Sequence, residues 1–126
     1  VFLSLGFNDK LHRVAAVSKD FENDPYGREL KSRYNKLAKL LTAKYGNGAK
    51  NHHTDTELYT EPSSFLMGIK NGRSWHYTDY SNEKVSIQLG IRASSSSVGY
   101  YLLIYQNKAL EKGVKEQLKK KEKEAL

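Results

Sequence analysis

The side chains best suited to chemistry in this sequence are its four histidines and the carboxylates near them. Two of the histidines, His52 and His53, precede Asp55 and Glu57 in one polar segment. Imidazole and carboxylate groups bind zinc and similar ions, so this segment is a candidate metal site. Adjacent histidines on an extended chain rarely converge on one ion, and we expect a polar surface loop here instead.

His76 is a second candidate, because it lies in a predicted strand three residues before Asp79. A histidine that acts as a general base needs a partner within about 3 Å. Side chains alternate along a strand, so His76 and Asp79 would face opposite sides of a sheet. His12 would be another partner if its strand were a neighbour. The large apolar side chain of Trp75 is expected in the core.

The sequence lacks the motifs of several enzyme classes, including Gly-x-Ser-x-Gly, the Walker phosphate loop and His-Glu-x-x-His. It also lacks cysteine, which excludes disulfides, thiolate metal ligands and a cysteine nucleophile. Its Gly-x-Gly pair, Gly46 and Gly48, follows a predicted helix and indicates a helix end rather than a phosphate loop. We therefore predict no catalytic residue, no bound metal and no cofactor.

The net charge of +7 is concentrated in two segments with helical patterns. Residues 28–50 carry seven Lys or Arg and one Glu, and residues 108–126 carry seven Lys and four Glu. These charges either solvate helix faces or attract an anionic partner, such as nucleic acid, an anionic lipid surface or an acidic protein. No apolar run approaches the roughly 20 residues that span a bilayer, so no transmembrane segment is expected.

One long amphipathic helix is predicted from Asp24-Pro25 to Gly46. Asp24 can accept hydrogen bonds from the free N–H groups at a helix start, and Pro25 suits the first helical position. Gly46 ends the helix because glycine adopts the left-handed conformation at little cost. Apolar side chains recur at helical spacing along this segment and should pack on a sheet. They are Leu30, Tyr34, Leu37, Leu41 and Tyr45.

Alternating apolar residues predict strands over most of the remaining chain. The sequence Asn71-Gly72, between two such runs, is the strongest short signal for a hairpin. Residues 99–106 are apolar on both faces, so both faces should be covered. The predicted strands cover residues 1–7, 11–18, 65–69, 74–80, 84–92 and 99–106, with a short strand at 58–60 inside the polar connection 47–64.

Together these elements predict an α+β fold of two layers. We expect an antiparallel sheet of five or six strands, with the long amphipathic helix packed on it and a C-terminal helix. Residues 1–107 should form a single domain, and residues 108–126 a basic helix or tail. This tail is the candidate cover for the second face of the strand at 99–106.

The order of these motifs resembles small bacterial exported or lipoprotein-like α+β proteins of uncharacterised function. The residues that carry the resemblance are Phe-Asn-Asp-Lys-Leu at 7–11, Tyr-x-x-Leu-x-x-Leu-Leu-x-x-Lys-Tyr-Gly at 34–46, Trp75, Ile87-x-Leu89 and Leu103-Ile104-Tyr105. They form a core pattern rather than an active-site pattern. The resemblance therefore implies a fold and an extracytoplasmic or envelope-associated location, and it assigns no functional residue.

Three functions are compatible with the sequence. The leading hypothesis is a non-enzymatic binding or inhibitory module, at the bacterial cell envelope if the resemblance extends to location, whose partner is an unknown protein or an anionic surface. The alternative is a basic nucleic-acid-binding domain, with Lys119, Lys120 and Lys121 adding phosphate contacts. The third is a small hydrolase that uses His76 or the segment 52–57. The candidate partner-binding residues are Tyr100, Leu102, Lys31, Arg33, Lys36, Lys39 and Lys44.

Overall fold

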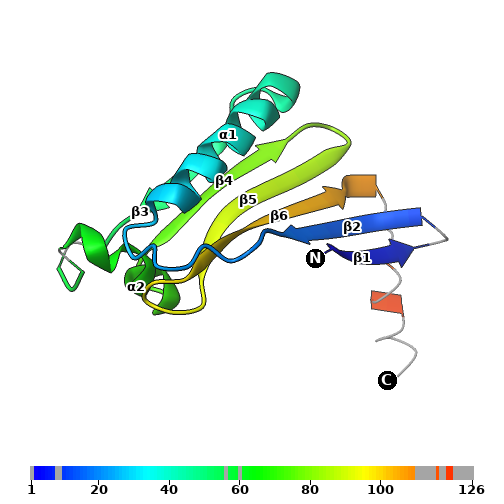
Figure 1. The fold of residues 1–126 in the computed structure, drawn as a ribbon. Helices are drawn as coiled ribbons and strands as arrows, with labels where there is room; N and C mark the ends of the chain where they lie inside the picture. The colour runs from blue at the N-terminus through cyan, green and yellow to red at the C-terminus, as the bar shows by residue number, and fades with distance from the viewer. Residues whose placement is uncertain are drawn as a thin grey trace.

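The computed structural model of the chain describes residues 2–7, 10–55, 57–59, 61–109, 116, 119 and 120. In this part of the chain, helices lie on one face of a six-stranded antiparallel sheet with the strand order β1-β2-β6-β5-β4-β3 (Figure 1). The predicted α+β class and antiparallel sheet are therefore confirmed. The elements are β1 (Phe2–Phe7), β2 (Lys10–Val17), α1 (Arg28–Tyr45), β3 (Ala49–His53), the 3-10 turn η1 (Pro62–Ser64), α2 (Phe65–Lys70), β4 (Trp75–Ser81), β5 (Val85–Ala93) and β6 (Gly99–Asn107).

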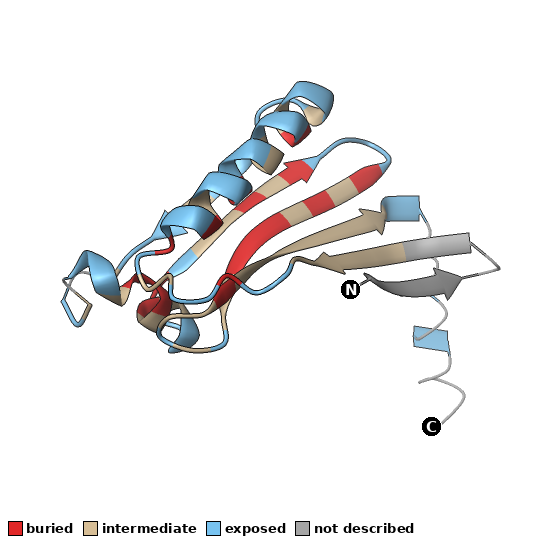
Figure 2. Cartoon of the chain, viewed as in Figure 1, coloured by how far each residue is buried: buried red, intermediate tan, exposed pale blue. Residues whose placement is uncertain are grey.

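The core lies between α1, α2 and the helix-facing side of the sheet. Strand β5 shows the expected alternation, with every second side chain buried against the helices (Figure 2). Leu30 and Tyr34 of α1 are almost fully buried, whereas the outer face of the same helix is exposed. The apolar residues of this core are Phe21, Leu30, Tyr34, Leu41, Phe65, Leu66, Tyr80, Val85, Ile87, Leu89 and Ile91.

Helix α1 starts at Arg28, three residues after Pro25, which the sequence pattern predicts as the first helical position. The reason is Gly27, whose backbone is left-handed with a φ of 68° and interrupts the helix. Asp24 still caps the first turn, because its carboxylate accepts the N–H groups of Arg28 at 2.9 Å and Leu30 at 3.2 Å. Pro25 lies in the preceding turn, and the helix ends before Gly46 as predicted.

Residues 65–69, predicted as a strand, form helix α2 instead. A short apolar run has no decisive period, and here Phe65 and Leu66 are buried beside the N-terminal end of α1. Pro62 begins the 3-10 turn that leads into the helix. Asn71-Gly72, predicted as a hairpin turn, ends α2: Gly72 has a φ of 75°, and its N–H donates to the carbonyl of Ile69 at 3.1 Å.

The predicted polar connection at 47–64 contains the edge strand β3, which the sequence analysis did not identify. Both faces of this strand are largely exposed, so its sequence has no apolar alternation to reveal it. The short strand predicted at 58–60 is wrong, because Leu58 lies in a turn.

The expectation that Trp75 belongs to the core is also wrong. Its side chain is 44% exposed, and its ring lies 4.4 Å from that of His53 between ring centroids. The alternation of β4 instead buries Thr78 and Tyr80 under α1.

The sheet face opposite α1 carries Tyr100 and Leu102, which are half-buried. On the other side of β6, Tyr101 and Leu103 pack against the core. Within the described residues, no helix covers the Tyr100 face. The predicted C-terminal helix at 108–126, which was the candidate cover, falls almost wholly outside the described residues.

Among the helices that the structure describes, none combines the length and the apolar content that a membrane crossing requires.

Replacing Leu30 with Ala should lower the free energy of unfolding by about 3 kcal/mol, because Leu30 is fully buried and truncation leaves a cavity. Leu40 of the same helix is 69% exposed, so Leu40→Ala should change stability by no more than about 0.5 kcal/mol. Urea unfolding followed by circular dichroism measures both values. Equal losses for the two variants would contradict the placement of α1 on the sheet.

Candidate functional site

A groove of about 450 Å³ runs between α1 and the edge strand β3. Lys39 of α1 stands on one side, Lys50 and His52 of β3 on the other, and Thr78 and Tyr80 of β4 form part of its floor. The groove lies beside the helix because α1 makes its main sheet contacts with β4, β5 and β6. Its remaining lining residues are Tyr34, Asn35, Ala38 and Thr42.

Hydroxyl groups on the groove floor tie α1 to the sheet. The Tyr34 hydroxyl forms a 2.7 Å hydrogen bond with the Thr78 hydroxyl and donates to the Leu89 carbonyl at 3.3 Å. The Tyr80 hydroxyl donates to the Ala38 carbonyl at 3.1 Å. Burial raises the pKa of Tyr34 to about 12, so this phenol stays neutral and acts as an anchor rather than as a proton donor.

Two histidines stack beside this floor on the helix-facing side of the sheet. The rings of His52 and His76 lie 3.6 Å apart at an angle of 15°, and the ring of Tyr34 meets His76 edge-on at 4.8 Å. The Nε2 atom of His76 is buried and has no hydrogen-bond partner among the described residues. Burial, with smaller contributions from His52 and Lys31, lowers the pKa of His76 to about 4. His76 is therefore neutral near pH 7.

The structure does not assemble the catalytic pairs that the sequence left open. Asp79 lies on the sheet face opposite His76 and accepts a hydrogen bond from Gln88 at 3.1 Å. His12 is on β2, and both β6 and β5 lie between β2 and the strand of His76. Neither Asp79 nor His12 is therefore the hydrogen-bond partner that a general base at His76 would need.

The segment His52–Glu57 does not converge on one point either. His52 and His53 point to opposite faces of β3, as their ring contacts with His76 and Trp75 show. The Asp55 carboxylate accepts the N–H groups of Glu57 at 2.9 Å and Leu58 at 3.2 Å. These hydrogen bonds, led by the one from Leu58, lower the pKa of Asp55. Asp55 thus stabilises a turn, and no group of three metal-ligating side chains occurs among the described residues.

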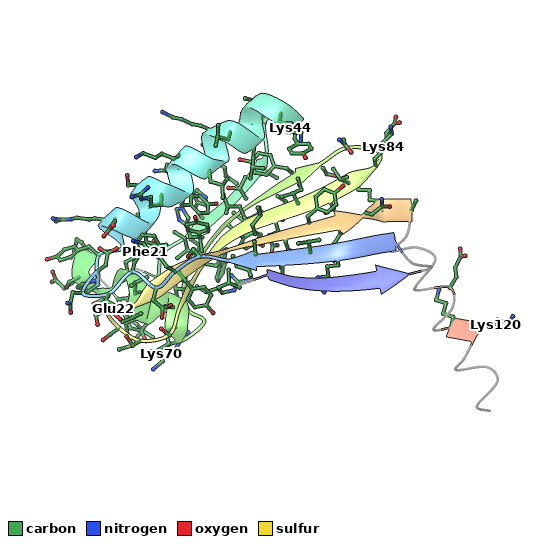
Figure 3. The ribbon with its side chains drawn as sticks, turned by 45° about the vertical axis from the view of Figure 1, so that its right-hand side comes forward. Phe21, Glu22, Lys44, Lys70, Lys84 and Lys120 are labelled. Atoms are coloured by element: carbon green, nitrogen blue, oxygen red, sulfur yellow. The ribbon has the colours of Figure 1, made fainter. Side chains whose placement is uncertain are left out.

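Cationic side chains continue the groove along the flank of α1. A depression of about 490 Å³ shares Asn35 and Lys39 with the first groove and Arg28 and Lys31 with a third depression of about 380 Å³ near the helix start. We call this continuous surface the α1 groove. Figure 3 shows nitrogen-tipped side chains projecting from α1. Across the three depressions, five Lys or Arg and one carboxylate line the surface.

Aromatic rings lie beside two of these cations. The Lys31 ammonium is 3.7 Å from the centroid of the Phe65 ring, and the Arg28 guanidinium is 4.4 Å from that of Tyr26. Burial lowers the pKa of Lys31, and the nearby Asp24 opposes this shift. These cation–π contacts place both cations at the wall of the α1 groove.

Part of this surface was predicted from the sequence. Lys31, Lys36 and Lys39 line the α1 groove. Arg33 lines none of these depressions, and Lys44 lies near the far end of α1 beside Tyr45 (Figure 3). Tyr100 and Leu102 lie on the other face of the sheet.

Lys50 and His52 were not predicted to line this groove, because strand β3 was not predicted. Its sequence has no apolar alternation that would reveal the strand.

Comparison of the chain with protein-family models, curated proteins and solved structures finds no match. The resemblance to small exported bacterial proteins has no support from these comparisons and stays a prediction.

Replacing His76 with Phe should flatten the pH dependence of stability. In the folded chain the pKa of His76 is about 4, against 6.5 for an unperturbed histidine. The unfolded chain therefore binds more protons in this interval, and stability falls as the pH drops from 6.5 towards 4. Urea unfolding at a series of pH values should show a shallower fall for His76→Phe than for the original chain.

His53→Phe is the matched control, because His53 is exposed on the opposite face of the sheet. Its pH dependence should follow that of the original chain. Identical curves for all three proteins would contradict the burial of the His76 ring.

Proposed function

We propose that the protein is a non-enzymatic binding module that holds an anionic partner along the α1 groove. The observation that carries this proposal is the row of cations on one flank of α1, joined by Lys50 from β3. Clustered charge of one sign in a groove concentrates ligands of the opposite sign and accelerates their association. This row of cations supports the sequence-based hypothesis of a binding module, and the α1 groove is the surface that we assign to it.

The arrangement of His76, Tyr34 and Thr78 argues against the hydrolase hypothesis. His76 is a poor base at a pKa of about 4, and its Nε2 atom has no partner among the described residues. The hydroxyls of Tyr34 and Thr78 are hydrogen-bonded to each other on the groove floor. A nucleophile activated by a neighbouring base is therefore not part of the proposal.

Nucleic-acid binding is the second candidate, and one observation favours it. Tyr26, Tyr59 and Phe65 line the same depression as Arg28 and Lys31. Single-stranded nucleic acid is commonly bound by aromatic rings that stack on bases beside cations that contact phosphates. Phe65 is buried, however, so Tyr26 and Tyr59 are the rings of this depression that such stacking would use.

The proposal depends neither on the cellular location of the protein nor on the sheet face that carries Tyr100. An envelope-associated or extracytoplasmic location follows only from the resemblance of the core pattern, and it stays a prediction. Tyr100 and Leu102 also stay predicted contact residues, and the proposal does not depend on them.

Charge reversal in the groove should weaken binding of an anionic polymer. We expect Lys39→Glu combined with Lys50→Glu to reduce the affinity for polyglutamate by about tenfold or more, because both ammonium groups line the same groove. Fluorescence anisotropy with labelled polyglutamate, at low and at physiological salt, measures the affinity. Binding to the original chain should weaken as salt rises.

The matched control is Lys70→Glu combined with Lys84→Glu, which makes the same change in net charge at exposed sites outside the α1 groove. It should retain most of the affinity. Equal losses for the two double variants would indicate a nonspecific charge effect. Tight binding of a single-stranded oligonucleotide with no binding of polyglutamate would favour the nucleic-acid candidate.

A further inference from the structure

The outer edge of β3 borders the α1 groove. β3 is the last strand in the sheet order, and its one strand neighbour among the described residues is β4. An edge strand presents backbone N–H and C=O groups that can pair with another extended chain. β3 is short and carries Lys50, which discourages pairing between copies of this strand but would attract an acidic one.

Because α1 lies beside this edge, a bound peptide could be recognised both through its backbone and through its side chains. Peptides that add a strand to a sheet gain affinity from backbone hydrogen bonds and specificity from pockets that receive alternate side chains. A strand added to β3 would lie about 4.8 Å from it and continue its pleat. Alternate side chains of this strand would then face the same side as Lys50 and His52, towards Asn35 and Lys39 of α1.

The chemistry of this space suits carboxylates. Lys39 and Lys50 supply two ammonium groups from opposite walls of the depression between α1 and β3, and no Asp or Glu is among the described residues that line this depression. The hydroxyls of Thr42 and Tyr80 on the same groove surface are bonded to each other, and Tyr80 donates to the Ala38 carbonyl, so a ligand would bind to the ammonium groups instead. Because carboxylates prefer charge-assisted hydrogen bonds to such groups, side chains of Asp or Glu at every second position fit best.

From these observations we infer that the partner is an extended acidic peptide, which adds to the outer edge of β3 and directs alternate carboxylates into the α1 groove. This inference rests on the proposed function and specifies the class of partner. A nucleic acid would use the charges of the groove but not the backbone of β3. The edge strand therefore favours a peptide.

The test uses a short peptide of alternating Glu and Val with the full chain, and two N-methylated forms of it. One form carries methyl groups on the Glu nitrogens, the other on the Val nitrogens. In an added strand, residues of one parity direct their N–H groups to β3 and those of the other parity direct them to solvent. Methylation of one set should therefore reduce affinity by about tenfold or more, and methylation of the other set should have little effect.

Two further readouts locate the complex. The backbone amide NMR signals of Ala49 to His53 should shift on binding. The fluorescence of Trp75, the single tryptophan of the chain, should also change, because its ring contacts His53. Lys50→Glu should weaken binding of the alternating peptide, whereas Lys70→Glu, at an exposed site outside the groove, should not.

The outcomes separate this inference from the function on which it rests. If both methylated peptides bind as well as the parent, or both lose binding, strand addition is wrong. Continued sensitivity to Lys39→Glu would then leave the anionic-partner function intact. If neither the alternating peptide nor polyglutamate binds, both proposals are wrong. An oligonucleotide could instead displace the peptide and shift the NMR signals of Tyr26 and Tyr59 but not those of β3. In that case the partner is a nucleic acid.

Discussion

The burial of Tyr34 beneath α1 is the interaction on which both the core and the groove depend. Its ring fills the space between helix and sheet, and its hydroxyl is satisfied by Thr78 and the Leu89 carbonyl. A buried hydroxyl without partners would cost more than the bond itself contributes, so these contacts determine how α1 rests on β4 and β5. The same ring borders the histidine pair, and thereby links the apolar core to the polar floor of the groove.

The packing of α1 on the sheet leaves a polar atom of the histidine pair buried without a hydrogen-bond partner among the described residues. His76 lies under α1 and α2 with a buried nitrogen that no described residue satisfies, and the neighbouring charge of Lys31 opposes its protonation. A neutral ring stacked on His52 avoids placing a second positive charge in this space. The site therefore gains its positive charge from Lys and Arg at the rim, where water solvates them, rather than from the histidines.

The parts of the fold that could be predicted from the sequence are those with a repeated apolar signal. The alternation of Val85, Ile87, Leu89 and Ile91 identified β5, and the helical spacing from Leu30 identified α1. β3 has no such signal, because an edge strand with two exposed faces buries no apolar set. Residues 65–69 are too few for their period to separate helix from strand. The groove was missed in consequence, although three of its lysines were identified.

Trp75 shows a different limit. The alternation of β4 was predicted correctly, but the sequence analysis assigned its largest apolar side chain to the interior. The tertiary position of α1 decides which face is buried, and it favours Thr78 and Tyr80, whose hydroxyls find partners there. Residue size alone does not carry this information.

The offset of α1 towards the β3 side also divides the sheet into two halves with different support. α1 packs over β4, β5 and β6, whereas the hairpin of β1 and β2 extends past the helix and joins the sheet through its ladder with β6 (Figure 1). Strands that join a sheet through one ladder open at a lower free energy than strands beneath a packed helix. The amide hydrogens of this hairpin are therefore expected to exchange with solvent sooner than those of the strands beneath α1.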